Sequence, residues 1–99
     1  MAVFAVTYVY APDSASTRDA VRAEHRTFLS ALNAEGKVLV SGPLPAHDDA
    51  PDGALIVVEA PSAAEAVALL DDDPFRRDDL VAQRTAREWV PVIGGFAAP

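Results

Sequence analysis

Two segments of the chain, residues 3–10 and 53–59, are apolar at almost every position. Side chains alternate between the faces of a sheet, so such a run is typical of a strand that is covered on both faces. Two further runs, residues 37–41 and 87–93, are also predicted to be strands. Pro91 cannot donate to a strand ladder, so we expect the last strand at a sheet edge.

Helices are predicted in the two long intervals that remain. The first is expected to begin at a cap, Ser16 or Thr17, and to end near Glu35, with Gly36 after its last turn. Residues 62–65 (Ser-Ala-Ala-Glu) have the capping-box spacing that opens a second helix. The resulting order, βαββαβ, predicts a ferredoxin-like α+β fold with a four-stranded antiparallel sheet. In that topology strands one and three are central, which agrees with the two apolar runs.

The length of 99 residues indicates one domain, residues 1–99. In this fold both helices pack on one face of the sheet, and apolar side chains of strands one and three remain on the other. The sequence is 51% hydrophobic, which is high for a small monomer and suggests that a partner covers apolar surface. The simplest cover is the same face of a second copy, so we expect a homodimer that pairs through its sheet faces.

Composition excludes several classes of function. The net charge of −7 argues against a nucleic-acid partner, which needs a basic face. The chain has no cysteine, hence no disulfide, thiolate nucleophile or Cys-zinc site. It has no signal-peptide features and no run of about 18 apolar residues, so we expect a cytoplasmic protein without a membrane partner. No glycine-rich phosphate loop or ligand cluster occurs, and no cofactor or metal is expected.

The most unusual stretch is residues 70–75, Leu-Asp-Asp-Asp-Pro-Phe. Three aspartates follow an apolar helical segment, although the helix dipole favours cations at that end. Pro74 forces Asp73 out of the α region, and the pair is suited to cap a further short helical turn. A local rule broken where the backbone is constrained is a place to expect function or strain. Asp71 and Asp72 are expected to face solvent.

His25 is the histidine that falls on an apolar helical face. The stripe around it, at about 100° per residue, consists of Val21, Phe28, Leu29 and Leu32. Imidazole titrates near neutrality, so His25 is a candidate general acid or base. The alternative is a buried structural histidine bonded to backbone. Asp73 has the same two interpretations: it orients His25, or it only caps a helix. The residue pattern by itself favours the structural interpretation for both His25 and Asp73.

Other polar residues have a functional and a plainer interpretation. Ser41 could be a nucleophile, but no Gly-x-Ser-x-Gly elbow surrounds it. Ser41, Gly42 and Pro43 are therefore interpreted as a strand end and rigid turn, where the glycine would allow close backbone approach to a ligand. Arg18 and Arg22 are solvated, or they meet an anionic substrate group or an aspartate.

The polar loop predicted over residues 44–52 contains His47-Asp48-Asp49. One imidazole and two carboxylates could bind a metal, but without a fixed scaffold a solvated hairpin is the favoured interpretation. Trp89 is expected in the core or in a dimer interface rather than in a pocket wall.

These features together resemble the YciI-like (YCII-related) family. The shared elements are Arg22-x-x-His25, Gly36, Ser41-Gly42-Pro43-Leu44, Gly53, the helix start at 62–66, Asp73-Pro74-Phe75 and Trp89. They span nearly the whole chain in the family's order. The resemblance implies a dimeric α+β barrel of ferredoxin-like subunits, with an active site that pairs His25 with Asp73. A relative is a dehydrochlorinase of chloroaromatic breakdown, and muconolactone-isomerase-like proteins share the barrel.

The leading hypothesis is therefore an enzyme. His25 and Asp73 would be the catalytic dyad for elimination, isomerisation or hydrolysis of a small cyclic or aromatic compound. Residues expected to bind the substrate are Arg22, Ser41, Gly42, Pro43 and Phe75. The alternative hypothesis is a barrel protein that binds or senses a small ligand without turnover. A third possibility is a structural dimer in which His25 and Asp73 only fill and cap.

Overall fold

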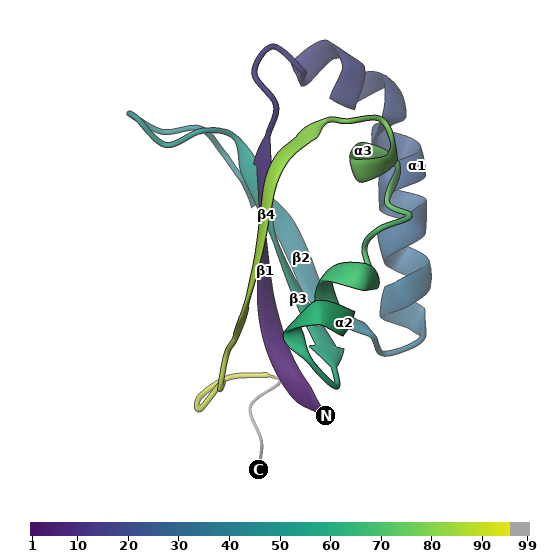
Figure 1. Ribbon diagram of the computed structural model, residues 1–99, viewed down its shortest axis with the longest axis vertical. Coiled ribbons are helices and arrows are strands. Elements are labelled where there is room, and N and C mark those ends of the chain that lie inside the picture. Colours follow the sequence, from purple (N-terminus) through teal and green to yellow (C-terminus); the bar gives the residue numbers. More distant parts are fainter. Residues whose placement is uncertain (96–99) are drawn as a thin grey trace.

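The computed structural model describes residues 1–95, which form seven elements in the order βαββααβ (Figure 1). In chain order they are β1 (Ala2–Tyr10), α1 (Ala15–Ala34), β2 (Val38–Leu44), β3 (Gly53–Ala60), α2 (Ala63–Ala68), α3 (Pro74–Arg77) and β4 (Val81–Glu88). The four strands make one antiparallel sheet in the order β2-β3-β1-β4. The predicted α+β fold is confirmed, with the apolar strands β1 and β3 central and β2 and β4 at the edges.

The helices lie on one face of the sheet (Figure 1). Alternate residues of β1 point toward them and are buried, and opposite them in the β1–β3 register lie alternate residues of β3. The core between sheet and helices includes Phe4, Val6, Tyr8, Ile56, Val58, Leu29, Ala66, Leu70 and Phe75. The apolar stripe predicted for α1 faces this core, and His25 therefore lies on the side of α1 that points toward the sheet.

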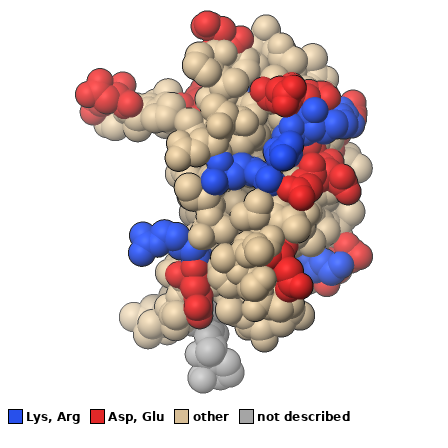
Figure 2. All heavy atoms as spheres, viewed as in Figure 1, with Lys and Arg blue, Asp and Glu red and all other residues tan. Residues whose placement is uncertain are grey.

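The other face of the sheet is not covered by any element of residues 1–95 (Figure 1). Val40, Leu44 and Leu55, which alternate away from the helices, are 46%, 41% and 37% exposed. In Figure 2 most charged side chains in view lie on the side of the helices, and fewer lie along the sheet. The apolar face that motivates the homodimer is therefore present, and the pairing itself stays a prediction.

The last strand differs from the sequence expectation. β4 spans 81–88, whereas we predicted 87–93, so Pro91 lies outside the strand. The apolar run 89–93 is largely exposed: Val92 and Ile93 are 78% and 94% exposed. Polar residues are tolerated in β4 because only one of its edges pairs, with β1. An edge strand thus needs less apolar sequence than we assumed.

Two local boundaries also differ. β2 extends through Gly42 and Pro43, which we expected to form a turn; a proline fits here because β2 is an edge strand. The cap of α1 is Ser14 rather than Ser16 or Thr17. Ser14 Oγ donates to the carbonyl oxygen of Ala11 at 2.6 Å, which fixes the entry to the helix two residues earlier.

Other local predictions are confirmed. Ser62 Oγ accepts the backbone N–H of Glu65 at 3.2 Å, as the capping box requires. Gly36 follows α1 with φ of 78°, the left-handed conformation that glycine adopts without strain. Within the described residues, no helix has the length and apolar character needed to cross a membrane.

Candidate functional site

Asp73 occupies the start of α3 with φ of −57° and ψ of 127°, outside the α region as its proline neighbour requires. Its carboxylate is completely buried. Oδ1 accepts the backbone N–H of Phe75 at 3.0 Å, and Oδ2 accepts the hydroxyl of Tyr8 at 2.8 Å. A buried carboxylate is stable only when such donors satisfy it. Asp73 is therefore a helix cap, as the plainer interpretation held, and it has a further partner.

That partner is His25, whose Nδ1 lies 2.7 Å from Asp73 Oδ1. An ionised carboxylate only accepts hydrogen bonds, so Nδ1 of the imidazole carries the donated proton. The His25 side chain is 11% exposed and lines a cleft, while Asp73 lies behind it. The ring edge that remains for the cleft is the one that contains Nε2. His25 is thus bonded to a carboxylate and not, as in the structural alternative, to a backbone group.

The plane of the imidazole is held by Phe75. The two rings are stacked with centroids 3.9 Å apart and planes 4° apart, and Tyr10 meets the Phe75 ring edge-on at 5.5 Å. Phe75 is itself 2% exposed. Stacking and the Nδ1 hydrogen bond together restrict rotation of the imidazole, so its Nε2 has one direction relative to the cleft.

The cleft lies between α1 and the strands β2 and β3 and has a volume of about 710 Å³. Its lining includes His25 and all the residues expected to bind a ligand: Arg22, Ser41, Gly42, Pro43 and Phe75. Ser41 and Pro43 pair with Ile56 and Ala54, whose side chains face the helices. The alternation of β2 therefore turns these two residues toward the cleft. In residues 1–95 no hydrogen bond joins Ser41 to His25, so the nucleophile interpretation of Ser41 gains no support.

One end of the cleft contains residues that sequence reasoning assigned incompletely or missed. Arg18 is 7% exposed; its Nε donates to Ser14 Oγ at 3.0 Å and its Nη2 to Asp52 Oδ2 at 3.3 Å. Its guanidinium also lies 4.2 Å from the centroid of the Tyr10 ring. Asp52 Oδ1 accepts the backbone N–H of Ala46, which ties the loop before β3 to α1. Of the alternatives for Arg18, the aspartate partner is the one observed.

Tyr8 was also missed, although a signal for it existed. Tyr8 and Tyr10 occupy alternate positions of β1, on the same face as Phe4 and Val6, and that face meets the helices. Burial, with the Asp73 carboxylate adding to it, raises the pKa of Tyr8 far above its usual range. Burial also raises the pKa of Tyr10. At neutral pH Tyr8 is therefore a neutral hydroxyl, which donates a hydrogen bond to Asp73.

Residues 2–90 match the YCII-related domain family. The chain belongs to this family. The family resemblance implied a ferredoxin-like subunit in which His25 lies beside Asp73, and the structure has both features. No curated protein matches the chain.

Among solved structures the chain is similar to 5-chloro-2-hydroxyhydroquinone dehydrochlorinase (TftG) from Burkholderia phenoliruptrix AC1100, in complex with 2,5-dihydroxybenzoquinone. The two are 28% identical with a TM-score of 0.72, and the match covers 88% of this chain and 92% of that one. Protein Atu4242 from Agrobacterium tumefaciens is 18% identical, with a TM-score of 0.55 and coverage of 98% and 97%. Rv0793 from Mycobacterium tuberculosis is 14% identical, with a TM-score of 0.50 and coverage of 93% and 95%. The last two share the fold alone.

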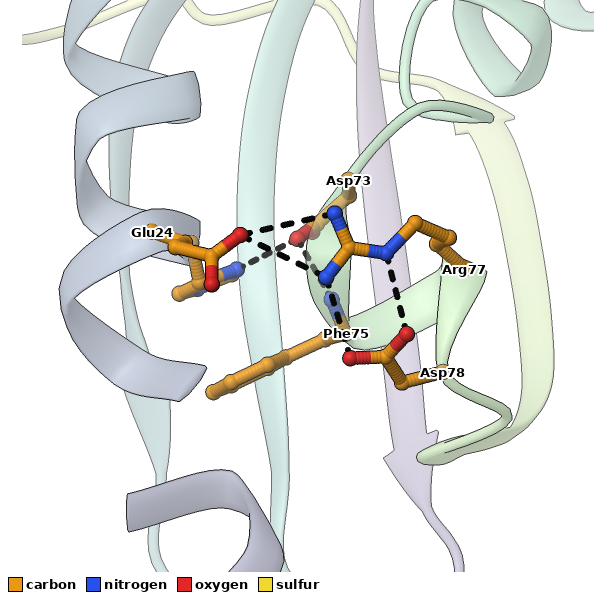
Figure 3. Close-up of polar contacts among 6 residues, drawn as sticks. Glu24, Asp73, Phe75, Arg77 and Asp78 are labelled. Atoms are coloured by element: carbon orange, nitrogen blue, oxygen red, sulfur yellow. Dashed lines mark hydrogen bonds and ion pairs between the residues drawn. The ribbon is translucent and has the colours of Figure 1, made fainter. Parts of the chain in front are cut away.

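In this YCII-related chain an exposed ion-pair cluster involves Glu24, which precedes His25 in α1, and Arg77, whose backbone N–H donates to the carbonyl oxygen of Asp73 at 2.8 Å. Figure 3 shows the Arg77 guanidinium between Glu24 of α1 and Asp78, in the same view as Asp73 and Phe75. Arg77 Nε donates to Asp78 Oδ1 at 2.9 Å, and both Nη atoms lie 3.4 Å from Glu24 Oε2. The hydrogen bond from Arg77 lowers the pKa of the Asp78 carboxyl. The cluster links α3 to α1 at the surface, where such pairs contribute little to stability.

The remaining polar candidates lie outside the cleft. His47 Nε2 lies 3.0 Å from Asp48, and both side chains are 84% exposed on the β2–β3 loop. Asp71, whose side chain is 52% exposed, pairs with the largely buried Arg84 at 2.9 Å. Trp89 is 42% exposed, so it is not part of the core, and its expected place in a dimer interface stays a prediction. In the described part of the chain no three His, Cys, Asp or Glu side chains gather as a metal site.

Proposed function

We propose that the protein is an enzyme that transfers a proton to or from a small cyclic or aromatic compound bound in the cleft. His25 is the general acid or base, and Asp73 is its partner. The observation that carries the proposal is the 2.7 Å contact between a buried carboxylate and an imidazole that lines a cleft of about 710 Å³. The reaction class is elimination, isomerisation or hydrolysis.

The proposed mechanism follows from the hydrogen bonds. Asp73 accepts three donors, from Tyr8, Phe75 and His25, and so keeps the imidazole proton on Nδ1. Nε2 then has a free lone pair toward the cleft and can accept a proton from substrate. The imidazolium that forms is stabilised by the Asp73 carboxylate, and the same proton can be returned in the next step. A positioned general base of this kind contributes about 10² to 10⁴ in rate.

The relative TftG supports the choice of a small ring compound. TftG is a 5-chloro-2-hydroxyhydroquinone dehydrochlorinase, and its structure contains 2,5-dihydroxybenzoquinone. Loss of HCl from a ring requires that a base accept one proton as chloride leaves, which is the task proposed for His25 Nε2. In the proposed complex the ring of a substrate lies in the cleft near Phe75, between Arg22 of α1 and Ser41, Gly42 and Pro43 of β2, because these residues line the cleft together with His25.

We also propose that the working unit is a homodimer formed through the uncovered sheet faces, in the cytoplasm. The support is the apolar face that includes Val40, Leu44 and Leu55. Fold alone does not imply catalysis. A ligand-binding protein without turnover is therefore the competing proposal, and the experiment below separates the two.

The test compares His25→Gln with His47→Gln on chlorinated and unchlorinated hydroxyhydroquinones, with release of chloride and ring spectra as readouts. His47 is the matched control because it is exposed and is not among the residues that line the cleft. We expect His25→Gln to lose about 10²-fold or more of kcat and His47→Gln to retain wild-type kcat. Full activity in His25→Gln on a compound that the wild type converts would contradict the catalytic role. Thermal stabilisation by these rings without any conversion would favour the binding protein.

A second readout tests Asp73 without a substrate. The ¹⁵N shifts of neutral His25 should show the proton on Nδ1, and Asp73→Asn should shift the tautomer toward Nε2–H, because an amide is a weaker acceptor than a carboxylate. His47 serves as the internal reference. A tautomer of His25 that is unchanged in Asp73→Asn would contradict the positioning role of Asp73.

A further inference from the structure

Three arginines occur at four-residue intervals along one side of α1, and all three line the cleft: Arg18, Arg22 and Arg26. The whole chain has 15 acidic residues and 8 basic ones. In the cleft lining the ratio is reversed, because Asp52 is the single carboxylate among the described lining residues. Asp52 is already paired with Arg18. The cleft wall is thus locally cationic in an acidic protein.

A merely solvated helix face does not account for this stripe. Like charges four residues apart repel each other and destabilise a helix. Arg22 pairs with Asp19, whose side chain is 67% exposed, so a ligand could replace that carboxylate at little cost. Arg26 is exposed, and no carboxylate of residues 1–95 lies within ion-pair distance of it. Two guanidinium groups therefore remain available at the cleft.

Both available arginines line the same cleft as the proposed base. Arg22 precedes His25 by three residues and Arg26 follows Arg22 by four, and helix residues at these spacings are neighbours, with Cβ atoms about 5–6 Å apart. Arg26 directly follows His25 in the chain, so it reaches the cleft beside Arg22 and not from the same helix face as His25. His25 is buried, whereas the Arg22 side chain is 37% exposed, so the arginines lie nearer the mouth of the cleft. If the anionic group of a ligand is held at the mouth, the ring to which it is attached can extend into the cleft and reach His25 Nε2.

We propose that the substrate of this site is an organic anion, a ring that bears a carboxylate or an ionised enol or phenol group. Arg22 and Arg26 hold the anionic group, while Arg18 stays bound to Asp52 and shapes the end of the cleft. This inference rests on the proposed function, because it specifies the substrate class of the same cleft. Guanidinium groups suit the task because they offer paired donors to planar oxyanions.

The experiment measures binding and not turnover. The probes are 2,5-dihydroxybenzoate and 2,5-dihydroxybenzamide, which share the ring and differ in one charge, titrated by NMR against wild-type protein. The variants are Arg22→Gln and Arg26→Gln, and the matched control is Arg76→Gln. Arg76 is an exposed arginine of α3 outside this cleft, so its loss changes net charge equally. Thermal unfolding confirms that each variant folds.

We expect the wild type and Arg76→Gln to bind the carboxylate about tenfold more tightly than the amide, with a preference that decreases as salt is raised. Arg22→Gln and Arg26→Gln should each lose most of that preference. Equal affinities for the two probes, an equal preference in all variants, or no shifts at cleft residues with either probe would overturn the inference.

His25→Gln separates this inference from the proposed function. It should keep the preference for the carboxylate, since His25 is not assigned to the anion. If turnover of a substrate depends on His25 but the charge preference is absent, the enzyme proposal stands and the anion inference fails. If the preference is present in wild type and His25→Gln but no ring compound is converted, the anion site stands and the catalytic proposal fails.

Discussion

The imidazole of His25 and the phenyl ring of Phe75 lie parallel, with centroids 3.9 Å apart and planes 4° apart. One oxygen atom fixes the positions of both residues: Asp73 Oδ1 is 2.7 Å from His25 Nδ1 and 3.0 Å from the backbone nitrogen of Phe75. A residue that caps α3 therefore also aligns an aromatic face with the side chain on α1. The capping and orienting interpretations of Asp73 are two consequences of one geometry.

The stacked rings predict a signature in Phe75→Leu. The carbon-bound protons of His25 lie over the Phe75 face and should be shifted upfield relative to those of exposed His47 in wild type. In Phe75→Leu this difference should largely disappear. The variant should also lose stability, by less than the about 3–5 kcal/mol typical of Phe→Ala in a core. Proton spectra and denaturant unfolding measure both effects; His25 shifts that are the same in both proteins would refute the stacking.

The two tyrosines predict the alkaline behaviour of the protein. The pKa of Tyr8 and of Tyr10 is raised in the folded state, with burial as the main cause for each. The unfolded chain releases these protons above about pH 10, and the folded protein does not. The free energy of unfolding should therefore be unaffected by them below pH 10 and should fall above it, by up to about 1.4 kcal/mol per pH unit for each phenol.

Absorbance at 295 nm tests this point, since the chain has only two tyrosines. Tyrosinate should appear together with the loss of circular dichroism and not before it. Tyr8→Phe should lower stability at neutral pH by about 1–3 kcal/mol, because Asp73 loses a donor, and should have a shallower alkaline decline. Reversible titration of both tyrosines near pH 10 in folded protein would show that they are not buried as described.

The close approach of Gly53 to the backbone of β1 predicts that a larger residue at this position lowers the stability of the fold. A Cβ at Gly53 would lie 2.0 Å from the carbonyl oxygen of Tyr8, a backbone atom of the adjacent strand that cannot move aside cheaply. Gly53→Ala should cost about 3 kcal/mol or more. Gly42→Ala is the matched control on the facing strand, because its Cβ would meet no atom within 4 Å. Chemical denaturation of both variants checks the contrast, and equal stabilities would contradict the β1–β3 register at Gly53.

The uncovered sheet face predicts the oligomeric state. Leu55 is on the central strand β3 and is 37% exposed in the single chain. Leu55→Lys should convert a wild-type dimer into a folded monomer, because a lysine there would be desolvated in the interface. Thr27→Lys, at an exposed position of α1, is the control and should remain dimeric. Sedimentation velocity gives the masses; a wild-type monomer, or a Leu55→Lys dimer, would refute pairing through this face.

Sequence periodicity was sufficient for the layout of the fold. Residues 3–10 and 53–59 are apolar on both alternating faces and form the central strands β1 and β3, and the apolar stripe of α1 placed His25 against the core. Edge elements were less predictable. β4 carries Arg84 and Arg87 and was placed too late in the chain, because strand pairing with β1 outweighs the low apolar content of an edge.

What the sequence determined by itself is local: the strand and helix periods, the Asp73-Pro74 cap, and the types of side chain available for chemistry. Only the tertiary structure decided which of those side chains meet. Tyr8, His25 and Asp73 lie far apart in the chain, and their contact depends on the packing of β1, α1 and α3 against one another. The distances between these three side chains are set by how the elements pack around the shared core. Short-range spacing in the sequence does not encode that packing. The same packing leaves Arg22 and Arg26 along an open cleft, next to the one imidazole that a buried carboxylate holds in place.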